Sequence, residues 1–109
     1  PTYHRRAVEI AAAIHDIPGV AIKPDPPQTH MMHIYLRGAP DRLMEASLAL
    51  ACDERVAIIP WLRPADVPGY AMFELSIGDG ASAFTNEEIA GYFTRIVGEA
   101  NAENAENAE

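Results

Sequence analysis

The run of residues 28–37, QTHMMHIYLR, constrains the fold of this chain most strongly. It follows Pro24, Pro26 and Pro27, which fix φ, lack an N–H donor and therefore disfavour a helix leading into the run. Successive side chains of a strand point to opposite faces. The run is therefore predicted to be a central β-strand with a core face and a mixed face. His30, Met32, Ile34 and Leu36 fall on the core face, whereas Met31, His33, Tyr35 and Arg37 fall on the mixed face.

Three segments carry the three- and four-residue apolar spacing of amphipathic helices. The first stops before Pro18, the second spans residues 40–51, and the third starts at the capping box Thr85-x-x-Glu88. Each helix is expected to bury one stripe. The stripes are Tyr3, Ala7, Ile10, Ile14 and Ile17 in the first, Leu43, Leu48 and Leu50 in the second, and Ile89, Tyr92, Phe93, Ile96 and Val97 in the third.

Three further segments are predicted strands: residues 20–23, residues 55–60, and residues 70–77, which alternate like the central strand. The loop of residues 61–68 is braced by prolines and is expected to form a functional edge. The order α-β-β-α-β-β-α predicts an α+β fold with a small, mostly antiparallel sheet of about four strands and three helices mainly on one face. Monomers seldom expose a large apolar patch, so part of the mixed face is expected to meet another domain or subunit.

Composition and charge exclude several functions. The chain has 109 residues, enough for one domain with its own core. Its net charge of −8 and scattered basic residues exclude a nucleic-acid binder. No apolar run has membrane-spanning length and no signal peptide is visible, so no membrane association is expected. Cys52 is the single cysteine, which favours the reducing cytoplasm, and it is expected to be a small buried hydrophobe.

The chain is predicted to divide into a domain of residues 1–98 and a tail of residues 99–109. The tail contains three copies of Asn-Ala-Glu and no large apolar side chain, so it is expected to be a frayed helical extension or a cloning remnant. The sequence begins at Pro1, directly in a helical pattern. We therefore expect a processed piece of a longer protein, or a trimmed one.

Four candidate site residues emerge: His30, His33, Arg63 and Glu74. The two histidines are three apart on a strand, so they point to opposite faces and no metal site is expected. His33 and Glu74 share the mixed face and form either an acid–base pair or a plain solvated ion pair. Arg63 could grip a carboxylate with two parallel hydrogen bonds, or pair with Asp66 instead. No set of residues makes this chain a catalyst on its own.

Four stretches of the chain follow one another in the order found in a known family. They are HRRAVEIAAAIHDIPGV, PDPPQTHMMHIYL, RVAIIPW and FELSIGDGASAFTNEEIAGYF, and they span nearly the whole chain. In the C-terminal small domain of threonine-aldolase-like, β-eliminating-lyase pyridoxal-phosphate enzymes, a helix ending in PGV leads through a proline-containing connector into a strand beginning Gln-Thr-Asn. Here that triplet is Gln28-Thr29-His30. The sequence therefore resembles that domain, which belongs to the aspartate-aminotransferase-type fold.

The resemblance implies one lobe of a larger enzyme. Such enzymes carry pyridoxal phosphate on a lysine of the large domain, and Lys23 does not match that position, so this chain alone is expected to bind no cofactor. The implied partners are the large cofactor-binding domain, further copies in a homo-oligomer, and an amino-acid substrate. By alignment with the family, Glu74 stands where an arginine usually holds the substrate carboxylate, and His30 replaces the usual asparagine. The carboxylate would then need Arg63 or an arginine of the large domain.

These observations favour the small domain of a pyridoxal-phosphate-dependent lyase of amino-acid metabolism. It would cleave a Cα–Cβ bond of a β-hydroxy amino acid, and this lobe would close the active site. A second interpretation stays open: a free-standing α+β module that dimerises through the mixed face and binds a small metabolite without catalysis.

Overall fold

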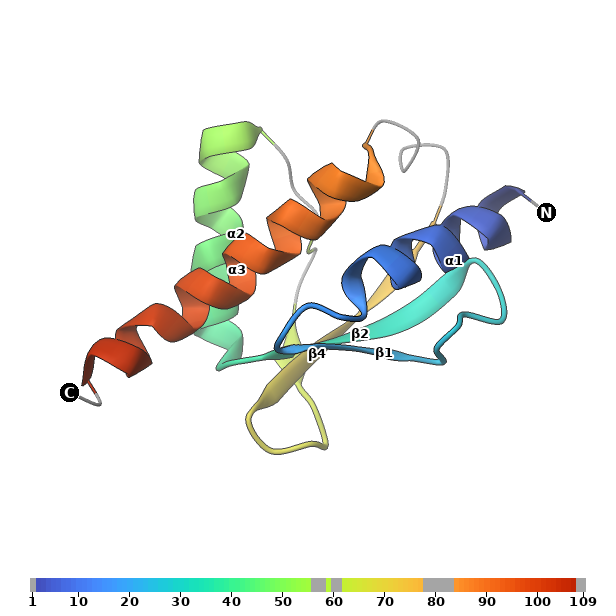
Figure 1. Ribbon diagram of the computed structural model, residues 1–109. Coiled ribbons are helices and arrows are strands. Elements are labelled where there is room, and N and C mark those ends of the chain that lie inside the picture. The colour runs from blue at the N-terminus through green and yellow to red at the C-terminus, as the bar shows by residue number, and fades with distance from the viewer. Residues whose placement is uncertain (1, 56–58, 60–61, 78–83, 108–109) are drawn as a thin grey trace.

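The computed structural model describes residues 2–55, 59, 62–77 and 84–107. These residues form an antiparallel four-stranded sheet, in the order β1-β2-β4-β3, and three helices (Figure 1). The predicted α+β class and the element order α-β-β-α-β-β-α are confirmed. The elements are α1 (Thr2–Ile14), β1 (Val20–Lys23), β2 (Met31–Arg37), α2 (Pro40–Glu54), β3 (Arg63–Pro64), β4 (Tyr70–Ser76) and α3 (Asn86–Asn107).

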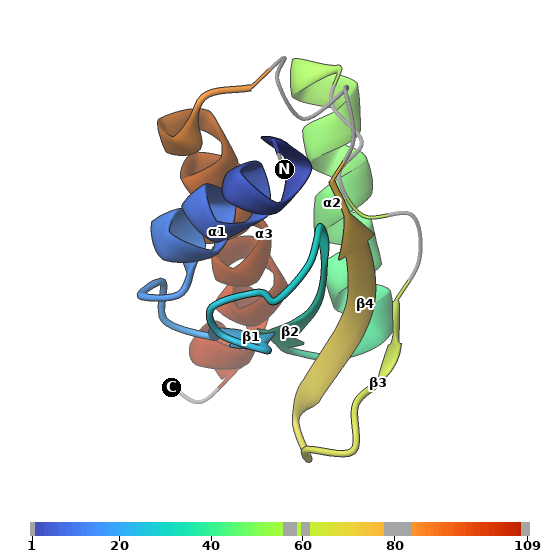
Figure 2. The same ribbon diagram turned by 90° about the vertical axis from the view of Figure 1, so that its right-hand side faces the viewer.

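The core lies between one face of the sheet and the helices, which pack on the same side of it in both views (Figures 1 and 2). The rings of Phe73 on β4 and Phe93 on α3 stack with their centroids 6.3 Å apart. Burying a side chain of this size contributes about 1.5–3 kcal/mol to the stability of the fold. The other fully buried large side chains are Ile14, Met32, Ile34, Leu36, Leu43, Leu50, Ile96 and Pro27.

The remaining alternate residues of the strands lie on the opposite face, as the alternation predicts. Directly opposed residues of an antiparallel pair share a face. The register opposes His33 to Glu74 and Arg37 to Tyr70, so these pairs share the mixed face. We call this surface the open face. It comprises Ala21, Lys23, Met31, His33, Tyr35, Arg37, Arg63, Tyr70, Met72, Glu74 and Ser76.

The third helix begins at the capping box predicted from the sequence. The Thr85 hydroxyl accepts a hydrogen bond from the Glu88 amide at 3.1 Å, and the Glu88 carboxylate accepts one from the Thr85 amide at 2.9 Å. Both donors would otherwise lack a helical partner. The guanidinium of Arg6 donates to the Phe84 carbonyl at 2.6 Å and also bonds the Asn86 side chain, which ties the start of α3 to α1.

Two residues of α2 are exposed where the sequence predicted burial. Leu48 is 60% exposed, and Cys52 is exposed as well. The buried stripe begins at Leu43 and reaches Leu50 through Ala46 and Ser47. With 100° per residue, Leu48 lies about 140° around the helix from Leu43, outside the stripe. Cys52 lies about 180° from Leu43 by the same count, so both predictions are wrong for the same geometric reason.

The central strand starts later than predicted. It begins at Met31, because the Thr29 hydroxyl accepts a hydrogen bond from the Met31 amide at 3.1 Å, a local turn that competes with strand pairing. His30 is exposed and does not pack in the core. Its carbonyl nevertheless accepts a hydrogen bond from the Ile77 amide at 2.8 Å. Its predicted place on the core face is therefore wrong.

The strand beside β4 also differs from the prediction. Arg55 ends α2 in the left-handed conformation with φ of 57°, and Arg63–Pro64 forms β3 inside the predicted loop. Most of the predicted strand of residues 55–60 lies outside the described residues, as does Trp61. At the other end, α3 continues through residues assigned to the tail. Ala100 is 3% exposed there, and the Asn101 amide donates to the Arg37 carbonyl at 3.0 Å.

Candidate functional site

Three ionisable side chains form one row across the open face. The register opposes Lys23 of β1 to His33 of β2, and His33 to Glu74 of β4. His33 Nε2 and a Glu74 carboxylate oxygen are 3.3 Å apart. The Lys23 amine leans away along the sheet and lies 5.3 Å from the centroid of the Tyr35 ring, a cation–π distance. The sequence prediction that His33 and Glu74 share a face is confirmed.

The row borders a shallow hollow of about 260 Å³. Pro24 and Thr29 of the connector form one wall, and Met31 supplies an apolar edge that is 40% exposed. The His33 and Glu74 side chains are 42% and 52% exposed, so both can reach a ligand in the hollow. In the tautomer in which His33 Nε2–H donates a hydrogen bond to Glu74, Nδ1 of His33 carries no proton and can act as a base. This is the arrangement needed for proton exchange with a ligand.

The other two candidate residues are placed differently. Arg63 on β3 opposes Met72, so it is on the open face but not in the row of His33 and Glu74. It is exposed, as is Asp66 in the following turn. His30 precedes β2 and does not line the hollow. The structure therefore brings together His33 and Glu74, keeps Arg63 on the same face, and leaves His30 outside.

Sequence reasoning missed Lys23 as a member of the row. The signal was present in the short strand of residues 20–23, because an antiparallel hairpin across the proline connector opposes Lys23 to His33. In the part of the chain that the structure describes, no group of three or more histidine, cysteine or carboxylate side chains is placed to hold a metal ion. The described helices also include none with the length and apolarity needed to cross a membrane.

Comparison with known proteins identifies the fold. No protein-family model matches the sequence, and no curated protein matches it significantly. A candidate aromatic amino acid β-eliminating lyase/threonine aldolase from an Exiguobacterium species matches with a TM-score of 0.72 and 22% identity, over 88% of this chain. A candidate L-allo-threonine aldolase from Listeria monocytogenes matches with a TM-score of 0.75 and 21% identity, over 90% of this chain. This chain spans 27% of the length of each.

These matches confirm the structural resemblance that the sequence indicates. Nearly the whole chain shares its fold with about a quarter of two larger proteins, and both carry descriptions from the threonine aldolase and β-eliminating lyase group. At this level of identity the likeness establishes the fold alone, because one fold can carry different functional sites.

Proposed function

We propose that this chain is the small domain of a pyridoxal-phosphate-dependent, threonine-aldolase-like lyase of amino-acid metabolism, which cleaves the Cα–Cβ bond of a β-hydroxy amino acid. The observation that carries the proposal is the fold match, which covers 88–90% of this chain but 27% of each lyase-like chain. Such coverage is expected of one domain of a larger enzyme. The order of sequence segments supports the same assignment independently.

The residues of this chain do not fit the cofactor. Pyridoxal phosphate is held as a Schiff base by a lysine amine. Lys23 is the only lysine in the sequence, and its amine lies over the ring of Tyr35 at the exposed edge of the sheet. We therefore assign the cofactor lysine to the large domain, so that this lobe supplies substrate-facing side chains but not the lysine of the Schiff base.

The role we assign to this lobe is to close the active site with its open face. The charged or titratable and accessible side chains of that face include Lys23, His33, Arg37, Arg63 and Glu74, while Met31 adds exposed apolar surface. A mixed surface of this kind suits an interface between domains, which is more polar than a permanent core. The large domain would cover it, and copies of the enzyme would associate as a homo-oligomer in the cytoplasm.

Within that arrangement, Glu74 and His33 would border the substrate from the side of this lobe. A carboxylate repels the carboxylate of an amino acid and attracts a hydroxyl or ammonium group. Glu74 would therefore face the substrate side chain, while Arg63 or an arginine of the large domain binds the substrate carboxylate. The enzyme would then favour a substrate whose side chain carries a hydrogen-bond donor.

The test uses the protein encoded by the complete reading frame. We expect it to release glycine from at least one member of a panel of β-hydroxy amino acids that includes threonine and allo-threonine. Glu74→Gln should lower kcat/KM by about tenfold or more for the preferred substrate, because one charge-assisted hydrogen bond is worth about 1.5–3 kcal/mol. Glu45→Gln, on the outer side of α2, is the matched control and should leave kcat/KM unchanged. A complete protein that releases no glycine from any substrate of the panel contradicts the proposal.

A further inference from the structure

The open face carries charge of the opposite sign to the rest of the chain. The four described strands contain three basic residues, Lys23, Arg37 and Arg63, and one acidic residue, Glu74. All four residues lie on the open face. The sequence as a whole contains 8 basic and 16 acidic residues and has a net charge of −8. The open face is therefore a locally positive surface of an acidic protein.

The middle of the open face is apolar but already covered. Tyr35 opposes Met72 there, and they are only 8% and 7% exposed, although the helices pack on the other side of the sheet (Figure 2). The Lys23 amine lies 5.3 Å from the centroid of the Tyr35 ring, and Arg63 flanks Met72 from β3. Long basic side chains lay their stems on apolar surface and keep their charged ends in water. A partner therefore meets positive charge here rather than exposed apolar area.

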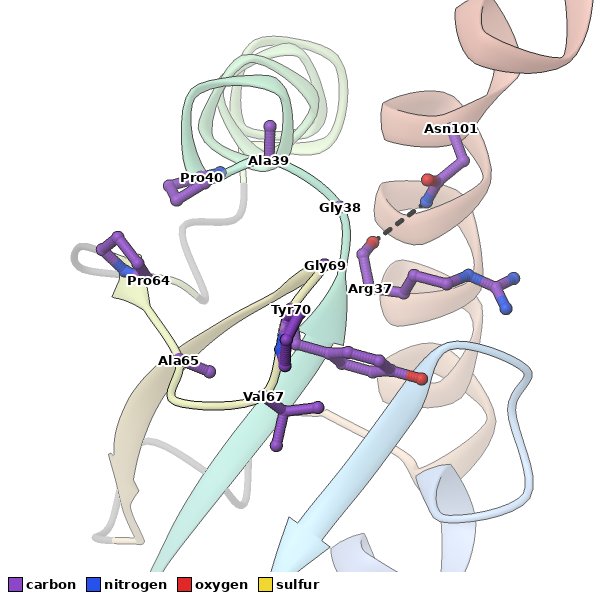
Figure 3. A pocket seen from close by; sticks show the side chains of 11 residues that line it. Arg37, Gly38, Ala39, Pro40, Pro64, Ala65, Val67, Gly69, Tyr70 and Asn101 are labelled. Atoms are coloured by element: carbon purple, nitrogen blue, oxygen red, sulfur yellow. Dashed lines mark hydrogen bonds between the residues drawn. The ribbon is translucent and has the colours of Figure 1, made fainter. Parts of the chain in front are cut away.

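Arg37 places a further positive charge at the end of β2. A cavity of about 490 Å³ forms there, where β2 runs into α2 beside the turn that precedes β4 (Figure 3). Figure 3 shows Arg37 and Tyr70 extending away from Pro40 and Pro64, so the guanidinium does not face the apolar wall of this cavity. A Cβ added at Gly19 would lie 3.6 Å from Arg37 Nε, so the stem runs along this turn. Among the described residues the guanidinium has no hydrogen bond or ion pair, and it is suited to pair with a carboxylate of a partner.

Carboxylates at the margins of the open face do not remove this excess of positive charge. The Asp25 carboxylate of the proline connector lies 3.1 Å from Nδ1 of His15, at the end of α1. Asp66 is exposed in the turn after β3. On the face itself, a Glu74 carboxylate oxygen lies 3.3 Å from His33 Nε2. The basic residues of β1, β2 and β3 therefore outnumber the carboxylates of the strands even when Glu74 is counted.

We propose that the open face docks on an acidic surface of the large domain. The inference rests on the proposed function in taking this chain, which spans 27% of each lyase-like chain, as one lobe of a larger protein. Carboxylates of the large domain would pair with Lys23 and Arg37, and Arg63 would add to the positive field. Solvated pairs of this kind contribute about 0.2–1 kcal/mol each, so the lobe would dock reversibly, as the closing of an active site requires.

The experiment is crosslinking of the protein encoded by the complete reading frame with a water-soluble carbodiimide, which joins an amine directly to a carboxylate in contact with it. Lys23 is the only lysine of the 109 residues, so its crosslinks can be assigned by mass spectrometry. We expect Lys23 to be joined to an aspartate or glutamate outside the 109 residues. Crosslinks of Lys23 confined to carboxylates of the 109 residues, in the same or in a second copy, or no crosslink of Lys23 at all, would overturn the proposal.

Charge-reversal variants separate docking of this face from a general effect of net charge. Arg37→Glu should lower the yield of the Lys23 crosslink by about threefold or more, because it turns an attraction into a repulsion. Arg5→Glu makes the same change of charge at an exposed arginine of α1 and should leave the yield unchanged. Equal yields for the two variants would refute the electrostatic basis of docking. If Arg37→Glu does not fold, Arg37→Gln against Arg5→Gln gives the same comparison, with an expected loss of about twofold or more.

Failure of this proposal can be told apart from failure of the proposed function, because the crosslink requires neither cofactor nor turnover. A complete protein that forms the crosslink but releases no glycine contradicts the lyase assignment and supports the docking surface. A complete protein that releases glycine but forms no such crosslink contradicts the docking surface alone.

Discussion

The packing of α3 against the turn after α1 can be tested by adding one carbon atom. Gly19 has φ of +87°, and a Cβ at this position would lie 2.7 Å from Cγ1 of Val97, a side chain that is 5% exposed. Gly69 has nearly the same φ of +82°, yet no atom lies within 4 Å of its added Cβ. Alanine at Gly69 therefore incurs backbone strain alone, whereas alanine at Gly19 also overpacks the core.

These two contributions give a difference that can be measured. A residue with a Cβ in the left-handed region costs about 1–2 kcal/mol, and overpacking a filled core costs about 1–3 kcal/mol more. Gly69→Ala should then lower the free energy of unfolding by about 1–2 kcal/mol, and Gly19→Ala by about 2–5 kcal/mol. For a domain of this size, 1 kcal/mol corresponds to a Tm shift of roughly 4–5 °C.

The assay is thermal and urea unfolding followed by circular dichroism, on each variant and on both variants in a Val97→Ala background. Removing Cγ1 of Val97 should reduce the cost of Gly19→Ala toward that of Gly69→Ala, because the strain of the backbone and the 3.3 Å contact with Cβ of Arg37 are what remain. The cost of Gly69→Ala should not change in that background. Equal costs for the two glycine variants in the unmodified chain, or a Gly19→Ala cost that is unaffected by Val97→Ala, would refute the reasoning.

Three further outcomes are expected. Thr85→Ala should lower the free energy of unfolding by about 1 kcal/mol in urea unfolding, because it removes the cap of α3; no change would contradict the cap. Leu48→Gln should change it by less than about 0.5 kcal/mol, whereas Leu50→Ala should cost about 2–5 kcal/mol; similar costs would contradict the phase of α2. Desolvation and two neighbouring carboxylates raise the pKa of Tyr92 above its ordinary value of 10.0, so the folded state favours the neutral phenol. The stability that the raised pKa of Tyr92 contributes is complete below pH 10 and is lost as the pH rises further. The difference in the free energy of unfolding between Tyr92→Phe and the unmodified chain should therefore change only when urea unfolding is measured above about pH 10.

The features predicted correctly from the sequence are those that local geometry determines. The capping box of Thr85 and Glu88 lies within one helical turn, and the alternation of residues 70–77 sets one face of a strand without reference to the rest of the chain. The same alternation placed His33 and Glu74 on one face. The register of β2 against β4, which opposes His33 directly to Glu74, is a tertiary feature that the alternation does not determine.

The features missed depend on tertiary contacts or on the phase of a short element. The burial of α2 is decided by which side meets α3, so an apolar residue such as Leu48 can lie outside the stripe. The backbone around His30 is decided by a turn at Thr29 rather than by apolar alternation. The cavity at Arg37 joins residues from β2, from the turn before β4 and from α3, and no sequence spacing relates these segments.

The measurement that tests the central claim most directly is borohydride reduction of the protein encoded by the complete reading frame, followed by mass spectrometry of its lysine-containing peptides. If this chain is the small domain of a pyridoxal-phosphate lyase, the intact protein should absorb visible light as a cofactor complex. The reduced pyridoxyl label should then lie on a lysine outside the 109 residues described above. An intact protein that carries no pyridoxyl label, or one labelled on Lys23, would contradict the account.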